Sequence, residues 1–250
     1  MIHDPLFYGV AVVAVLITAI SKGGFGGGLG VMAVPLMSLV IDPIRAAAIL
    51  LPILCLMDIF GVWAYRRTWD GANLRILIPA AVVGIAVGTA LVRLIDEDFI
   101  RVLVGLIAVL FSLDYWIRRG RVSGNVQRLS RAKGGLWGGL AGFTSFLAHA
   151  GGPPVSVFLL PQRMDKSVLV GTTAIFFISV NYLKLIPYAY LGQLSAANLR
   201  ESLVLAPLAP IGIGLGVWLH NRVSEKLFYQ VSYVLVFLTG AKLLWDVFAH

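Results

Sequence analysis

Charged residues are scarce in this chain. Only 13% of its 250 residues are Asp, Glu, Lys or Arg, whereas 59% are hydrophobic. A soluble domain of this size needs more charged residues than that to cover its surface. Apolar runs follow one another along the whole chain and leave no room for a soluble domain beside them. The sequence therefore predicts an all-α, polytopic membrane protein.

The residues that most metal sites and nucleotide sites require are also missing. The single cysteine, Cys55, excludes an intrachain disulfide and argues against a Cys/His metal site. No cluster of carboxylate, His or Cys ligands lies within the apolar runs. The sequence contains no G-x-x-x-x-G-K-[ST] loop, so ATP cannot drive a process from within this chain. We therefore expect neither a metal nor another cofactor.

Glycine, in contrast, is abundant and is concentrated in two stretches. The first is SKGGFGGGLGVMAVP (Ser21–Pro35), and the second is GGLAGFTSFLAHAGGPPVSVFLL (Gly138–Leu160). Glycine within a helix costs about 1 kcal/mol relative to alanine, so both stretches are predicted to interrupt their helices. Irregular backbone at membrane depth is tolerated only where it is buried in protein or lines a cavity.

We expect a new helix after each interruption, over Gly30–Ile41 and over Pro154–Leu160. A helix that begins at membrane depth presents unpaired N–H groups and the positive end of its dipole. Two such helix starts, meeting near the membrane midplane, could hold one small oxyanion between them. The alternative is that the glycines only allow helices to pack closely. Whether each stretch is a hairpin or a single broken crossing stays open.

The chain also contains an internal repeat. Three matches in the same order, at a spacing of about 125 residues, indicate a duplication. Each half then has about five helical segments, and this odd number inverts the second copy relative to the first, as in many secondary transporters. The matches pair Trp63–Arg75 with Tyr188–Arg200, Gly88–Phe99 with Gly216–Phe228, and Gly24–Leu36 with Gly142–Leu160. The predicted parts are a first repeat at 1–117, a linker at 118–133 and a second repeat at 134–250.

Basic residues indicate how the chain is oriented. The linker at 118–133 carries six Lys/Arg and no acidic residue, so we expect it to be cytoplasmic, in a multi-pass protein of the cell inner membrane. If both glycine-rich stretches turn the chain back, 14 Lys/Arg lie in cytoplasmic loops and five in outer loops. Single broken crossings weaken this split to about 11 against 7. The net charge of +8 is thereby explained by topology, and no nucleic-acid binding is expected.

Two charged residues lie inside apolar runs, where charge is costly and therefore indicates function. Asp58 and Lys184 occupy nearly matching positions of the two repeats, and Asn181 precedes Lys184 by one turn. We expect them to line a shared cavity, with Lys184 attracting the anion and Asp58 carrying a coupling proton. The alternatives are a structural ion pair, or a lysine whose charged end reaches the membrane surface.

A histidine adjoins the second glycine-rich turn. His149 stands just before Gly151, and Ser145 precedes it by one turn. Histidine donates hydrogen bonds and titrates near neutrality, so His149 is predicted to bind substrate, to carry a proton, or both; a histidine with only a structural role is the alternative. The predicted substrate-binding residues are Lys22, Gly24, Gly26, Gly27, Gly28, Gly30, Ser145, His149, Gly151, Gly152, Asn181 and Lys184, and the predicted ion-coupling residues are Asp58 and His149.

Two glycine-rich hairpins on either side of a basic central loop resemble the sulfite exporter TauE/SafE family, also called the toluenesulfonate uptake permeases. The resemblance covers nearly the whole chain, and it is closer in the first hairpin than in the second, where FLAHAGGPP replaces a more glycine-rich segment. It implies transport of sulfite, sulfonates or related sulfur oxyanions, driven by a proton or anion gradient, with export as the favoured direction.

Other functions stay open at this point. The cargo could be another small anion such as a carboxylate, or the direction could be uptake. An intramembrane hydrolase would use Ser145 and His149, which are four residues apart, but the chain lacks the G-x-S-x-G and H-E-x-x-H patterns, so no enzyme activity is expected. A non-transporting membrane component is the remaining alternative. The expected partners are a small anionic substrate and the lipid bilayer, and the glycine-rich helix faces would permit a homodimer.

Overall fold

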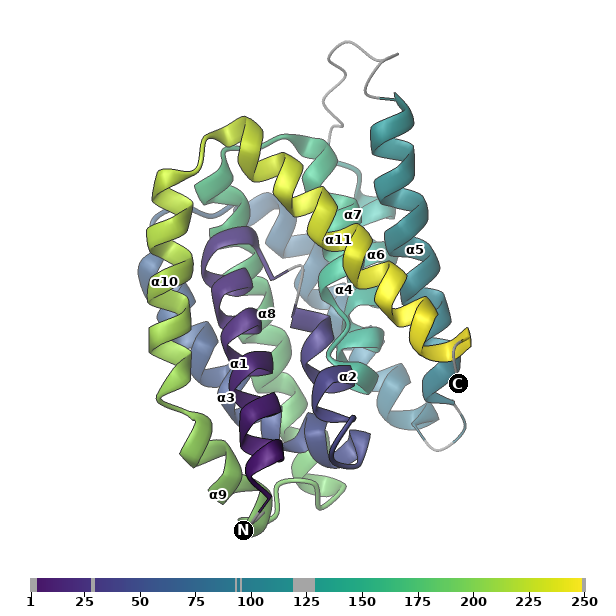
Figure 1. The fold of residues 1–250 in the computed structure, drawn as a ribbon. Coiled ribbons are helices and arrows are strands. Elements are labelled where there is room, and N and C mark those ends of the chain that lie inside the picture. Colours follow the sequence, from purple (N-terminus) through teal and green to yellow (C-terminus); the bar gives the residue numbers. More distant parts are fainter. Residues whose placement is uncertain (1–3, 28–29, 93, 95, 119–128, 249–250) are drawn as a thin grey trace.

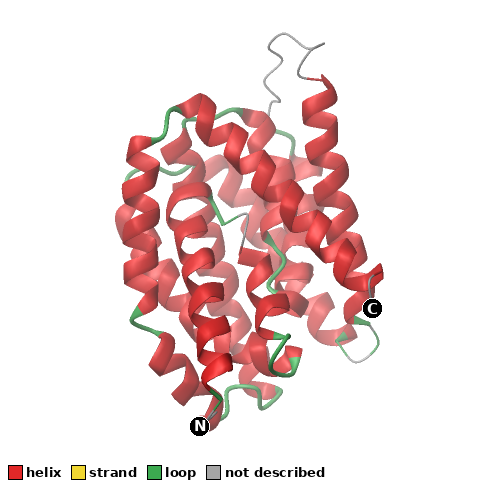
Figure 2. Ribbon diagram, in the orientation of Figure 1, coloured by secondary structure: helices red, strands yellow, loops and turns green. Residues whose placement is uncertain are grey.

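The computed structural model describes residues 4–27, 30–92, 94, 96–118 and 129–248. Over these ranges the chain consists of helices and short connections without a β-strand (Figure 2), so the all-α prediction is confirmed. The helices, labelled in Figure 1, are α1 (Pro5–Phe25), η1 (Gly30–Met32), α2 (Ala33–Met37), α3 (Pro43–Ala64), α4 (Gly71–Leu91), α5 (Glu97–Arg118), α6 (Arg131–Ala148), α7 (Gly152–Leu159), η2 (Leu160–Gln162), α8 (Lys166–Tyr190), α9 (Ala196–Leu205), α10 (Leu208–Arg222) and α11 (Glu225–Phe248).

Several helices are long and apolar enough to cross a membrane. By length and composition, five of the described segments qualify: α1, α3, α4, α8 and the part of α11 over Lys226–Val247. A sixth is formed if α9 and α10, which are bent by 42° at their break, count as one span. The prediction of a multi-pass membrane protein is therefore confirmed.

Short polar side chains begin the helices at corresponding places in the two halves. The Asp42 carboxylate accepts hydrogen bonds from the second and third N–H groups of α3, and the Asp165 carboxylate does the same for α8. Asp70 and Ser195 each accept the N–H three residues onward, at the starts of α4 and α9. Such caps satisfy N–H groups that have no partner within the helix.

Glycines allow pairs of helices to approach closely. A Cβ atom added at Gly84 of α4 would lie 1.9 Å from the Gly139 carbonyl oxygen of α6, and one added at Gly24 of α1 would lie 2.7 Å from the Gly216 carbonyl oxygen of α10. Small residues are a common means of bringing membrane helices into contact. Accordingly, α4 packs along α6, α1 along α10 and α5 along α11 (Figure 1).

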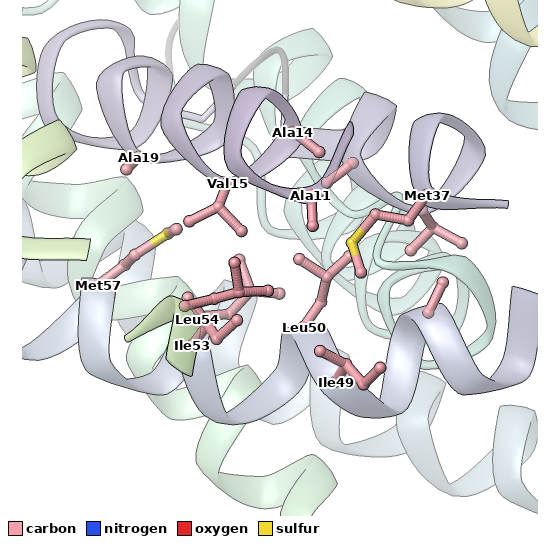
Figure 3. Close-up of a cluster of buried hydrophobic side chains, with 14 of the residues drawn as sticks. Ala11, Ala14, Val15, Ala19, Met37, Ile49, Leu50, Ile53, Leu54 and Met57 are labelled. Atoms are coloured by element: carbon pink, nitrogen blue, oxygen red, sulfur yellow. The ribbon is translucent and has the colours of Figure 1, made fainter. Parts of the chain in front are cut away.

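The buried apolar side chains form two large clusters. The first joins α1, α2 and α3 to α9 and α10, with residues such as Val15, Leu50 and Met57 at its centre (Figure 3). The second joins α6, α7 and α8 to α4 and to one side of α3. The helix that follows α3 therefore packs with the second half of the chain, and the helices that follow α8 pack with the first half.

Both glycine-rich stretches turn the chain back, since α2 packs against α1 and α7 packs against α6. The expected second helix, α7, begins two residues before the predicted Pro154. The expected first helix over Gly30–Ile41 is wrong in length, because only the single turn η1 and the five-residue α2 form. Gly23 and Gly24 were expected to be irregular but lie within α1, where their contact with α10 outweighs the low helix propensity of glycine.

Candidate functional site

The first turn reverses the chain at the end of α1. Gly26 and Gly27 adopt left-handed backbone conformations, with φ of 71° and 83°, and glycine adopts these without steric cost. The N–H groups of both residues donate to the carbonyl of Ser21, which closes the end of the helix. The turn therefore depends on two positions where the backbone conformation favours glycine.

Side chains from other helices hold this turn in place. The Tyr65 hydroxyl donates to the Gly23 carbonyl over 2.7 Å, and burial raises the pKa of Tyr65, which keeps the hydroxyl protonated as a donor. His220 Nδ1 lies 3.0 Å from the Gly24 carbonyl, which only accepts, so Nδ1 carries a proton. The other ring nitrogen, Nε2, then accepts from the Ser167 hydroxyl over 3.1 Å.

The second turn, at the end of α6, is built around a side chain. His149 has a φ of 52°, a left-handed conformation that is uncommon for residues other than glycine. Its Nε2 donates to the Ala47 carbonyl over 3.0 Å, which leaves Nδ1 as an acceptor for Lys184 Nζ at 2.8 Å. With both ring nitrogens committed in this way, His149 is neutral, and it does not act as a base for Ser145. The alternative of a Ser145–His149 hydrolase pair loses its support.

Lys184 is fully buried, and its ammonium contacts neutral groups. Nζ donates to the Ser145 carbonyl and to the Ser145 hydroxyl, each over 3.0 Å, and to His149 Nδ1. These three acceptors match the three N–H groups of an ammonium. Within the described parts of the chain, Lys184 has no ion-pair partner. The Lys184 amino group is thus buried among neutral partners, with no carboxylate bonded to it in the described parts of the chain.

Asp58 pairs with a different lysine. Its carboxylate oxygen Oδ1 lies 2.6 Å from Lys22 Nζ, and Oδ2 accepts from Asn181 Nδ2 over 2.6 Å. Asp58 is completely buried, while Lys22 also lies over the ring of Phe177, with Nζ 4.8 Å from the ring centroid. Asp58 therefore forms an ion pair, which was the alternative interpretation of this residue, and its partner is Lys22.

The two turns line one cavity, of about 20 Å³. This volume is room for about one water molecule. Thr18, Leu54 and Phe177 also line the cavity, and they were not predicted from the sequence. Two of them could have been found from helical spacing, because Thr18 precedes Lys22 by one turn and Phe177 precedes Asn181 by one turn, which places each pair on one helix face. Leu54 offers no comparable signal. The predicted residues that line the cavity are Lys22, Gly27, Gly30, Ser145, His149, Gly152 and Asn181.

The remaining predicted residues lie outside this lining. Asp58 borders a smaller cavity of about 10 Å³ together with Lys22 and Gly26, and Lys184 lies behind Ser145 and His149. Gly24 faces α10, and a Cβ added at Gly151 would lie 2.9 Å from the Ala141 carbonyl oxygen, so both are placed in helix contacts. Gly28 is outside the described residues.

The start of α7 offers the cavity fewer N–H groups than expected. Gly152 occupies its first position and lines the cavity, but the next two residues are prolines, which have no N–H. The first helix start is weaker still, since α2 has only five residues. The positive character of the cavity therefore comes mainly from lysine side chains.

A comparison with protein families identifies the chain. The family model described as "Sulfite exporter TauE/SafE" matches residues 10–243. Comparisons with curated proteins and with solved structures give no match.

Proposed function

Because the chain belongs to the sulfite exporter TauE/SafE family, we propose that it is a secondary transporter of small sulfur oxyanions, sulfite or an organosulfonate, in the cell inner membrane. The direction is export, and the driving force is a proton or anion gradient. Its multi-pass helical fold and the cavity between two turns support this function.

The observation that carries the proposal is the burial of the Lys184 amino group among neutral partners. A buried ammonium is costly unless a negative charge compensates it. The groups bonded to Lys184 are neutral, and two of them, Ser145 and His149, line the cavity between the turns. An anion bound in that cavity supplies the missing negative charge. The Ser145 oxygen accepts from Lys184, so its own hydrogen is free to donate to the anion.

The size of the cavity indicates a closed conformation. Sulfite has four non-hydrogen atoms, and room for about one water molecule does not contain it. Binding and release therefore require the two turns to separate, first toward one side of the membrane and then toward the other. Such alternating exposure of a fixed site is the usual mechanism of transporters built from inverted repeats.

The repeat and its boundaries at 1–117, 118–133 and 134–250 are part of the same proposal. The matching helix caps and the packing of α1 on α10, as α6 packs on α4, support an inverted repeat. The orientation can be tested because Cys55 is the only cysteine. In a Cys55→Ala background, a membrane-impermeant thiol reagent applied to intact cells should label Ala197→Cys, at the start of α9, and spare Ala132→Cys, within the linker. The opposite labelling contradicts a cytoplasmic linker.

The proposed transport is tested in liposomes containing the purified protein. Radiolabelled sulfite and methanesulfonate are followed with and without a pH gradient. We expect flux from wild type, and flux reduced at least tenfold by Lys184→Met, which removes the charge and keeps an unbranched side chain. The exposed Lys226→Met serves as the matched control and should retain full flux. Absence of flux for every anion and gradient contradicts the proposal.

A further inference from the structure

The ionisable side chains around the cavity carry a net charge, and Asp58 determines its size because it cancels the charge of Lys22. We propose that the site selects singly charged oxyanions, such as a sulfonate or bisulfite, over doubly charged ones such as sulfate, and that Asp58 is the residue that determines this preference. The inference rests on the proposed function, because it concerns the anion that the same cavity binds.

The charge of the site follows from its hydrogen bonds. Among the described residues, four ionisable side chains line the cavity or bond directly to its lining: Lys22, Asp58, His149 and Lys184. His149 is neutral, because Nε2 donates to a carbonyl and Nδ1 accepts from Lys184. Lys22 and Asp58 cancel at a separation of 2.6 Å. When Lys184 is protonated, as it is with an anion bound beside it, one positive charge is left.

This single charge matters because the site is buried. Coulomb interactions strengthen as the effective dielectric constant falls, and dissolved salt screens buried charges much less than exposed ones. A singly charged anion brings the site to neutrality. A doubly charged anion leaves one uncompensated negative charge at membrane depth, where such a charge is costly. The structure therefore favours the single charge.

The lining also suits an anion with an apolar or protonated end. Leu54 and Phe177 provide an apolar wall that accepts the carbon substituent of a sulfonate. Asn181 uses its Nδ2 to donate to Asp58, so its Oδ1 remains as an acceptor for the O–H group of bisulfite. Sulfate has neither feature. Shape and charge thus point to the same class of anion.

Asp58→Asn tests the role of charge while nearly preserving shape. This substitution removes the negative charge that cancels Lys22, so the site carries two positive charges. The double substitution Asp58→Asn with Lys22→Gln removes one charge of each sign and returns the site to a single positive charge. If charge alone decides the preference, the single variant shifts it toward sulfate and the double variant restores it.

The experiment measures the affinities of methanesulfonate and sulfate for the purified full chain by isothermal titration calorimetry. Both anions keep one charge state across neutral pH, so protonation of the ligand does not interfere. Wild type should prefer methanesulfonate at least tenfold. Asp58→Asn should shift the ratio of the two affinities at least tenfold toward sulfate, and the double variant should bring it back.

The outcomes separate the two proposals. If wild type binds both anions equally, or prefers sulfate, the preference does not exist, although the transport proposal stands. If Asp58→Asn folds by size-exclusion chromatography and leaves the ratio unchanged, Asp58 does not set the preference. If wild type binds neither of these anions, nor sulfite, the proposed function fails and this inference with it.

Discussion

The two turns share a backbone plan but differ in chemistry. In the first turn, the N–H of Gly27 reaches back to the carbonyl of Ser21; in the second, the N–H of Ala150 reaches back to Thr144 in the same way. The residue before each of these donors has a left-handed conformation, and it is Gly26 in one turn and His149 in the other. The first turn therefore has a residue without a side chain at its left-handed position, whereas the second turn has a side chain there that makes hydrogen bonds.

The contacts behind the turns show the same relation. Lys22 follows Ser21 and pairs with Asp58 of α3, whereas Ser145 follows Thr144 and accepts from Lys184 of α8. One contact is an ion pair, and the other holds a lysine among neutral groups. The two turns thus share a backbone plan but differ in where their charged side chains find partners, and the proposed anion preference depends on this difference.

The ion pair and the isolated lysine should respond differently to substitution. Lys22→Met leaves a fully buried carboxylate with Asn181 as its remaining partner, and breaking a buried ion pair in this way costs about 3–5 kcal/mol. Lys184→Met leaves only neutral groups unpaired and should cost about 1–3 kcal/mol. Adding Asp58→Leu to Lys22→Met should recover most of the loss. The measurement is reversible unfolding in detergent, and equal costs for the two lysines would remove the distinction.

The second turn should tolerate glycine better than alanine at its left-handed position. His149→Ala loses the hydrogen bonds to Ala47 and Lys184 and keeps the unfavourable φ, for a cost of about 2–4 kcal/mol. His149→Gly loses the same bonds but relieves the backbone, so it should be more stable than His149→Ala by about 1 kcal/mol. The measurement is the free energy of unfolding of both variants in detergent. If His149→Ala is at least as stable as His149→Gly, the backbone conformation at this position does not matter for stability.

Adding a single methyl group to the first turn should lower the stability of the protein. Gly26→Ala forces a left-handed conformation on alanine and places its Cβ 3.2 Å from Leu169 Cδ2, so a loss of about 1–2 kcal/mol is expected. Gly214→Ala is the matched control, because no atom lies within 4 Å of its Cβ and alanine is the better helix former. Thermal unfolding should show a loss for the first and no loss for the second. A neutral Gly26→Ala would mean that the turn adapts.

One pair of substitutions should affect both halves alike. Tyr65 donates to the carbonyl of Gly23, and Tyr188 donates to the carbonyl of Phe146 at the corresponding place in the second half. Tyr65→Phe and Tyr188→Phe each remove one hydrogen bond and should each lower stability by about 1 kcal/mol. A large difference between them, seen in the same unfolding assay, would show that the two anchors are not equivalent.

Local features of the fold and site could be predicted from the sequence. Hydropathy places the helices, because apolar runs long enough to span a bilayer are a strong signal. The glycine-rich stretches mark both turns and the adjoining Lys22, and polar residues inside apolar runs mark other parts of the cavity lining, as with Ser145 and Asn181. Each of these predictions depends on residues that are close in the sequence.

Contacts between distant segments could not be predicted. Asp58 was matched with Lys184 from their positions in the repeat, but its partner is Lys22, which depends on how α1 and α3 face each other. Likewise, α4 packs with the second half, an arrangement that hydropathy does not encode. The helical state of Gly23 and Gly24 follows from contact with α10, a tertiary effect that outweighs local propensity.

The central claim is that both turns bind one oxyanion, and a crystal structure with selenite tests it most directly. Near neutral pH selenite is mainly the singly charged hydrogen selenite, which has the shape and charge of bisulfite, and selenium can be located by its anomalous scattering. We predict one selenium peak between the turns, in contact with Lys22 from the first half and with the Ser145 hydroxyl from the second. A peak that contacts only one turn, or that lies elsewhere in the molecule, contradicts the account.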